Sequence, residues 1–231
     1  MTELYGSIDD WLDGPHGGYP PKAVALRALY MQRVTRLLAT RPGLERTVVA
    51  RLPRRYGLEI HADAGASRRL FAHASAVKHP WHIRTQRPLP PETLLSYYRE
   101  AQQRFGVPWE ILAAVNLVES KFGRVRSSSS AGAQGPMQFI PSTWAAYGLG
   151  GDINDPHDAI LGAANYLHAN GAPWDERRAL YRYNPIVDYV EAVLAYAHQM
   201  ERDPRSLYVY YGFEVFVFTK HGEVRLTGSG A

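Results

Sequence analysis

Glu119 occupies an unusual place in a predicted helix. Pro108 suits the first turn of a helix and Gly123 suits its end, so we expect a helix from Pro108 to about Phe122. At about 100° per residue, Glu119 falls at the edge of an apolar stripe. The stripe consists of Ile111, Val115, Val118 and Phe122, with Leu112 also at its edge. Burial beside apolar neighbours raises the pKa of a carboxyl group, which a general acid near neutral pH requires. A glutamate at such an edge more often reaches out to water, so position alone makes Glu119 only a candidate.

The stretch GAQGPMQFIPSTW, residues 132–144, combines small residues, amides, prolines and aromatics. With the preceding serines it could be a flexible linker. Met137, Phe139 and Trp144 are large apolar residues that favour burial, however, and a linker would not need them. We therefore predict a loop that folds back beside Glu119 and offers hydroxyl, amide and backbone groups to a groove. Such groups, together with aromatic faces, are suited to binding sugars.

Three motifs in this order resemble the soluble lytic transglycosylase family, which has a lysozyme-like catalytic domain. They are VESKFG with Glu119 and Ser120, GAQGPMQ ending on Gln138, and YRYN with Tyr183 and Asn184, followed by the segment YVEAVLAYA. The resemblance covers about residues 92–202. It implies a mainly α, goose-type (SLT-type) helical catalytic domain, with an N-terminal helical region and a short C-terminal β-hairpin outside it. A secreted, actinobacterial-type member of the family is compatible with this layout.

The resemblance also implies roles for individual residues. Glu119 would be the sole catalytic acid and base, with Ser120 supporting the helix end beside the substrate. Gln138, after Met137 in the same motif, would hydrogen-bond the substrate, and Ser129 would position its acetamido group. Tyr183 and Asn184 would complete the substrate-binding set. No cofactor and no metal are implied. The sequence departs from the family pattern at two positions, with Pro136 in place of leucine and Arg182 in place of alanine.

The implied reaction is cleavage of the β-1,4 bond between N-acetylmuramic acid and N-acetylglucosamine in peptidoglycan, leaving 1,6-anhydromuramoyl ends. One carboxylate suffices when the substrate's own acetamido group assists. Two alternatives stay open. A goose-lysozyme-type muramidase would use water and a second carboxylate, for which Asp152 is the first candidate, and a non-catalytic peptidoglycan-binding module would bind without turnover.

Composition limits the other functions. The 231 residues carry a formal net charge of +4, which suits an anionic polymer but does not require one. The chain has no cysteine, which excludes disulfides and zinc-thiolate sites. No segment reads as a signal peptide or a membrane span. The arginines form no dense basic block, so we expect no nucleic-acid partner. An enzyme acting on peptidoglycan is nevertheless expected outside the cytoplasm, at the cell envelope.

Coarse patterns predict the organisation of the chain. We expect a loose leader at 1–21, an N-terminal helical region and linker at 22–90, the catalytic domain at 91–203 and a β tail at 204–231. The N-terminal helices could recruit a cell-wall protein partner. Helical runs are predicted at 22–41, 44–58, 66–77, 91–105, 155–171, 175–183 and 186–202. The tail SLYVYYGFEVFVFTKHGEVRLTG is predicted to form strands with a turn at residues 220–223.

Two further groups of residues are predicted to be structural. Asp152, Asn154, Asp155 and Asp158 suggest a calcium loop, but the sixth and twelfth positions are His157 and Ala163 instead of the required glycine and glutamate. Helix capping by Asp155 explains these acids better. The nine histidines have no acidic or cysteine partners at metal-ligand spacing, so we expect solvated roles.

Overall fold

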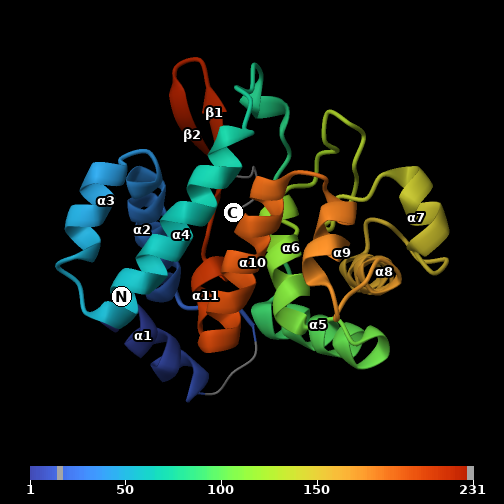
Figure 1. Ribbon diagram of the computed structural model, residues 1–231, viewed down its shortest axis with the longest axis horizontal. Helices are drawn as coiled ribbons and strands as arrows, with labels where there is room; N and C mark the ends of the chain where they lie inside the picture. The colour runs from blue at the N-terminus through green and yellow to red at the C-terminus, as the bar shows by residue number, and fades with distance from the viewer. Residues whose placement is uncertain (15–17, 228–231) are drawn as a thin grey trace. The chain divides into compact units, whose positions relative to one another are not determined.

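The computed structural model describes residues 1–14 and 18–227, which form a mainly α-helical protein with a short antiparallel hairpin (Figure 1). This confirms the predicted fold class. The chain divides into two compact units. Unit 1 comprises residues 1–74 and 186–213, whereas unit 2 comprises residues 75–185 and the chain from 214 onward. Each unit is therefore assembled from two separate stretches of sequence.

Unit 1 is a bundle of helices in which α4 and α10 form the most extensive pair and lie side by side (Figure 1). Helix α2 packs on α4, and α1 and α11 both pack on α2. Alternating small and large apolar side chains fill the space between these helices, among them Ala28, Ala64, Ala66, Val193 and Leu207. The helices are α1 (Thr2–Leu12), α2 (Lys22–Ala39), α3 (Pro42–Val49), α4 (Arg54–Ala72), α10 (Val187–Arg202) and α11 (Ser206–Tyr211).

The first helix corrects one expectation, because the segment read as a loose leader contains α1. Leu4, Tyr5 and Ile8 of this helix are buried, so its apolar residues hold it in the core although the glycines and prolines that follow break the pattern. Residues 15–17 of the expected leader lie outside the described chain. The predicted run 44–58 is also wrong, because Pro53 precedes a new helix and α3 has already ended. The run predicted at 66–77 belongs to α4, which ends at Ala72.

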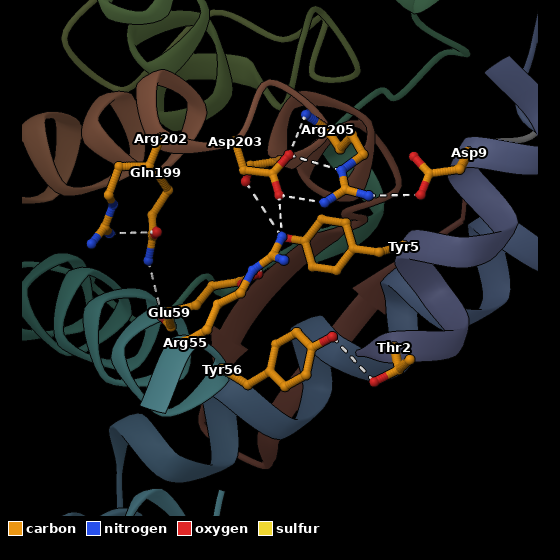
Figure 2. Close-up of polar contacts among 11 residues, drawn as sticks. Thr2, Tyr5, Asp9, Arg55, Tyr56, Glu59, Gln199, Arg202, Asp203 and Arg205 are labelled. Atoms are coloured by element: carbon orange, nitrogen blue, oxygen red, sulfur yellow. Dashed lines mark hydrogen bonds and ion pairs between the residues drawn. The ribbon is translucent and has the colours of Figure 1, made fainter. Parts of the chain in front are cut away.

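A polar network ties the first helix of unit 1 to the segment after α10 (Figure 2). Arg205 donates to Asp203 at 2.8 Å and to Asp9 of α1 at 2.6 Å, and its guanidinium lies 4.7 Å from the centre of the Tyr5 ring. The Tyr5 hydroxyl donates to the buried Glu59 of α4 at 2.6 Å. Arg55 donates to the same Oδ2 oxygen of Asp203 at 2.5 Å. These bonds give each buried polar group a partner, which burial requires.

Unit 2 contains the predicted helices of the catalytic region, close to their expected bounds. They are α5 (Pro91–Phe105), α6 (Trp109–Ser120), α8 (Pro156–Ala169) and α9 (Glu176–Tyr183), together with a 3₁₀ turn η1 (Pro80–His82) and the short α7 (Pro141–Tyr147), which the sequence analysis did not predict. Asp155 caps α8 by accepting from the backbone N–H groups of His157 and Asp158, as predicted. Asp175 caps α9 in the same way.

The tail is only partly β. The hairpin pairs β1 (Val215–Thr219) with β2 (Gly222–Leu226), close to the predicted turn. The preceding SLYVYY stretch, expected to be a strand, is instead α11, and all six of its residues are buried. Packing against neighbouring helices thus overrides the strand preference of its tyrosines and valine. Gly212 ends this helix where a Cβ would lie 2.4 Å from the side chain of Ala28.

The boundaries of the expected domains stay a prediction. The division into units falls at residues 74/75, 185/186 and 213/214, so the stretch 91–203 contributes to both units. Among the described helices, none is long and apolar enough to cross a bilayer.

Candidate active site

The end of α6 carries Glu119 and Ser120. Most of this helix is buried, whereas Glu119 is half-buried. The helix stops abruptly, because Lys121, Phe122 and Gly123 have φ values of 54°, 62° and 83°. Left-handed conformations cost energy for residues with a Cβ and cluster at functional sites. This turn points the chain away just after Glu119 and lets the backbone N–H of Phe122 bond the Asn116 carbonyl at 3.1 Å.

Ser120 connects the first motif to the second. It is 1% exposed, and its hydroxyl donates to the carbonyl of Pro136 at 2.5 Å while accepting from the Gly123 N–H at 2.8 Å. The Asn116 amide donates to the same Pro136 carbonyl at 2.8 Å and accepts from the hydroxyl of Tyr98 at 2.6 Å. A substrate could not reach the Ser120 hydroxyl without opening this network. In this structure Ser120 therefore holds the loop against the helix that carries Glu119.

This network also accounts for the unusual proline. Pro136 lacks an N–H group, but the site uses only its carbonyl, which accepts from both Asn116 and Ser120. The preceding Gly135 is required for two reasons. Its φ is 73°, and a Cβ would lie 1.8 Å from the carbonyl oxygen of Ile153. The loop is thus fixed on both sides.

Met137 and Gln138 differ in their exposure. Met137 is 0% exposed and fills the core under the loop, so its side chain does not face a groove. Gln138 is half-buried, has a φ of 51°, and donates from its side-chain amide to the Gly135 carbonyl at 2.9 Å. The amide oxygen and the second N–H of Gln138 remain as groups that a sugar hydroxyl could use.

Tyr183 connects the third motif to the other two. Its hydroxyl donates to the Met137 carbonyl at 2.6 Å. Burial and the negative charge of nearby Glu119 raise the pKa of the Tyr183 phenol well above its usual value, so the ring stays neutral. Residues from motifs that are far apart in sequence are therefore joined around Glu119. Asn184 follows directly, half-buried, at the end of α9.

An aromatic cluster supports this side of the site. The ring of Phe139 meets those of Trp144 and Tyr183 edge to face, with centroid distances of 5.3 and 5.6 Å. Tyr166 packs on Tyr183 at 5.4 Å, and its hydroxyl donates to the carbonyl of Arg182 at 2.7 Å. The Arg182 side chain is exposed, so an arginine in place of the alanine of the family pattern disturbs no packing.

Ser129 closes a turn in the loop before the second motif. Its hydroxyl oxygen accepts from the backbone N–H groups of Ala131 and Ala133, at 3.2 and 3.0 Å, and the residue is exposed. Two accepted bonds leave the hydroxyl hydrogen of Ser129 able to donate. The exposed hydroxyl of Ser129 could therefore donate to a ligand, which is compatible with its expected role.

The sequence analysis missed the buried residues Asn116 and Tyr98. Asn116 is 0% exposed in an otherwise apolar part of α6, four residues before Ser120, and it bonds both Tyr98 and the loop. A single amide within the run ILAAVNLV was the available signal, because a buried amide needs partners.

The acidic cluster after the loop is explained by local structure. Asp158 accepts from the Asp152 N–H at 2.9 Å, and the exposed Asp152 accepts from the Asn154 N–H at 2.8 Å. Asp155, His157 and Asp158 each offer one atom that could bind a metal ion, and these three atoms lie within 4.8 Å of one another. Because Asp155 caps α8 and His157 bonds Glu100 at 3.0 Å, these groups already have partners.

The candidate site thus consists of one half-buried carboxylate at a helix end, an amide-bearing loop pinned beside it, and a neutral tyrosine that bonds this loop and lies near the carboxylate. The helical fold and the family model reported next support a lysozyme-like domain. Residues 96–204 match the family model described as Transglycosylase SLT domain, so this stretch of the chain is similar to that family.

A search of curated proteins gives a compatible result. The chain is 29% identical over 163 residues to a protein named membrane-bound lytic murein transglycosylase F from Thiobacillus denitrificans. The match covers 67% of this chain but only 33% of the relative, so the chain corresponds to about a third of that protein's length. No solved structure matches the chain significantly.

Proposed function

We propose that this protein is a lytic transglycosylase that cleaves peptidoglycan between N-acetylmuramic acid and N-acetylglucosamine. One observation carries the proposal: the Ser120–Pro136 and Tyr183–Met137 hydrogen bonds join the three motifs at the half-buried Glu119. The family match and the name of the relative support the same activity. No cofactor is needed for this reaction.

In the proposed mechanism Glu119 acts first as an acid. Its carboxyl proton goes to the glycosidic oxygen, the bond from that oxygen to the muramoyl C1 breaks, and N-acetylglucosamine leaves with a free 4-hydroxyl. The muramoyl acetamido carbonyl stabilises the positive charge at C1. The C6 hydroxyl then bonds to C1 and gives its proton to the Glu119 carboxylate, which restores the enzyme and leaves a 1,6-anhydromuramoyl end. No water is consumed.

The surrounding residues would bind and orient the sugar. Gln138 would hydrogen-bond a hydroxyl near the bond that breaks, and Ser129 would donate to the acetamido oxygen. Neutral Tyr183 would place its ring and hydroxyl beside Glu119 without adding charge. The Asn184 amide would bind further along the strand. Ser120 would act by fixing the loop, and Met137 by filling the space beneath it.

The reaction would be tested by mass spectrometry of muropeptides released from purified peptidoglycan. Wild type should release anhydro-ended products. Glu119→Gln should lower the release at least about a thousandfold, because the amide cannot donate the proton as an acid. Glu110→Gln, in the first turn of the same helix, is the matched control and should retain activity.

Other outcomes would identify the rival functions. Reducing-end products would indicate a muramidase that activates water, and Asp152→Asn would then be the next variant. If wild type binds peptidoglycan but releases nothing, the protein is a non-catalytic binding module.

The substrate also determines where the protein would act. We propose an extracytoplasmic location at the cell envelope, because peptidoglycan lies there. A cell-wall protein partner could bind through the N-terminal helices. Fractionation of cells that produce the full protein would test the location, and recovery only with cytoplasmic markers would contradict it.

A further inference from the structure

Two surface hollows lie on either side of Trp81 in unit 2. One, of about 650 Å³, is mostly apolar and lies between residues 76–81 and the hairpin turn. The other, of about 690 Å³, extends along β2 and the residues that follow η1. Both include Pro80, Trp81 and Val224 in their walls. These residues lie outside the stretch that matches the family model, so the family match assigns them no role.

Trp81 is unusually accessible for its type. It is 71% exposed, although η1 packs against β2. The rings of His79 and His82 lie close to it, with centroid distances of 5.1 and 6.0 Å. An indole ring exposed to this extent leaves a large apolar area in water. A flat ligand, such as the C–H face of a sugar ring, would cover that area.

The second hollow is strongly basic. Within the part of the chain that the structure describes, its walls contain no aspartate or glutamate, and three exposed arginines, Arg84, Arg126 and Arg225, line it. Arginines gathered without acidic residues repel one another, so their grouping favours an anionic ligand. The planar guanidinium group binds a carboxylate through two parallel hydrogen bonds.

This surface is connected to the candidate active site through the backbone. The Arg126 N–H donates to the Arg84 carbonyl at 2.9 Å, and the Gln86 N–H donates to the Arg124 carbonyl at 2.8 Å. The Gln86 side chain also donates to the carbonyl of Gly123, in the turn that directly follows Glu119 and Ser120. Arg84 and Arg126 therefore stand on segments fixed to the turn after α6, toward which a strand bound at Glu119 could continue, and Arg225 on β2 lines the same hollow.

We propose that Trp81, Arg84, Arg126 and Arg225, called here the Trp81 surface, bind peptidoglycan away from the bond that is cleaved. Trp81 stacks on a sugar ring, and the arginines bind carboxylates of the peptide stems. The identity of this polymer rests on the proposed function. Peptidoglycan fits this surface better than a nucleic acid does. Its carboxylates are spaced along the strand between apolar groups, and the protein likewise has a basic hollow on one side of Trp81 and an apolar hollow on the other.

The test is binding to insoluble peptidoglycan, measured by co-sedimentation in the Glu119→Gln background so that nothing is cleaved. The double variant Arg84→Ala/Arg225→Ala should bind about tenfold more weakly than its parent, because charge-assisted bonds are lost. Arg99→Ala/Arg104→Ala, which removes the same charge from exposed positions on α5, is the matched control and should bind normally.

One further ligand and two further variants make the outcome specific. On chitin, a polymer of N-acetylglucosamine that carries no carboxylates, the arginine variant and its control should bind equally, whereas Trp81→Ala should bind more weakly than both. Thermal unfolding of each variant verifies that it is folded, and Trp81→Phe, which keeps an aromatic ring, should restore part of the binding.

The proposal is overturned if the arginine variant and its control lose affinity equally, because that indicates general charge attraction. It is also overturned if duplex DNA competes better than stem-bearing fragments, or if Trp81→Ala has no effect. Since binding is read without turnover, failure of the proposed reaction in wild type would leave this test interpretable.

Discussion

At the scale of single residues, Gly135 shows how closely the backbone of the second motif is constrained. Gly135 and Gly132 both have positive φ, at 73° and 82°, but only at Gly135 would a Cβ collide with backbone, whereas nothing lies within 4 Å at Gly132. Gly132→Ala should therefore cost about 1 kcal/mol from strain alone. Gly135→Ala should cost at least about 3 kcal/mol, because the loop must also move away from Ile153. Urea unfolding measures both, and equal costs would contradict the predicted collision.

The sequence identified three motifs that the structure joins through hydrogen bonds, but not how each of their residues packs. Glu119, Gln138 and Tyr183 carry recognisable motifs, and the structure places Glu119 and Tyr183 close enough to interact electrostatically. The burial of Ser120 and Met137 was not predictable, because burial depends on which segments pack against them. The role of Asn116 depends on a carbonyl twenty positions along the chain, which no local pattern reveals.

At the scale of elements, Arg205 joins α1 to the start of α11 (Figure 2). Its side chain is about a quarter exposed and bonds both Asp9 and Asp203. Arg205→Ala should lower the free energy of unfolding by about 1–3 kcal/mol, because Asp203 loses a partner while partly buried. Arg27→Ala removes the exposed 3.7 Å pair with Glu3 and should cost at most about 0.5 kcal/mol. Thermal unfolding measures both losses, and a larger loss for Arg27→Ala than for Arg205→Ala would contradict this ranking.

Helices with clear caps and regular apolar spacing were predictable, and those that depend on distant partners were not. Asp155 and Pro156 begin α8 as their local chemistry requires. In contrast, α11 consists of residues that favour strands and becomes helical only because neighbouring helices bury it. Helix α1 was hidden by the glycines and prolines that follow it, although Leu4, Tyr5 and Ile8 have helical spacing.

At the scale of the whole molecule, a buried carboxyl makes stability depend on pH. Burial, and next the charge of Glu59, raise the pKa of Asp63 to about 8, although the Tyr210 hydroxyl donates to it. The folded state thus holds a proton that the unfolded chain releases above about pH 4. The stabilising effect of this carboxyl is complete below about pH 4 and is lost as pH rises toward 8, at up to about 1.4 kcal/mol per pH unit.

The test is urea unfolding of wild type and Asp63→Asn between pH 5 and pH 8. Wild type should lose stability across this range, and the variant, which cannot ionise there, should lose clearly less. Parallel pH profiles would contradict the assignment to Asp63. Glu59, one turn earlier on α4, also has a raised pKa through burial, so a residual slope in the variant is expected.

The interleaving of the two units has a consequence for the order in which the chain can fold during synthesis. The helices α1 to α4 emerge first, but α10, the main partner of α4, is made only after more than a hundred further residues. Unit 2 in turn receives its hairpin last. Because contacts between distant residues form slowly and leave apolar surface uncovered meanwhile, we expect the nascent chain to stay a substrate for chaperones until α10 and the hairpin have left the ribosome.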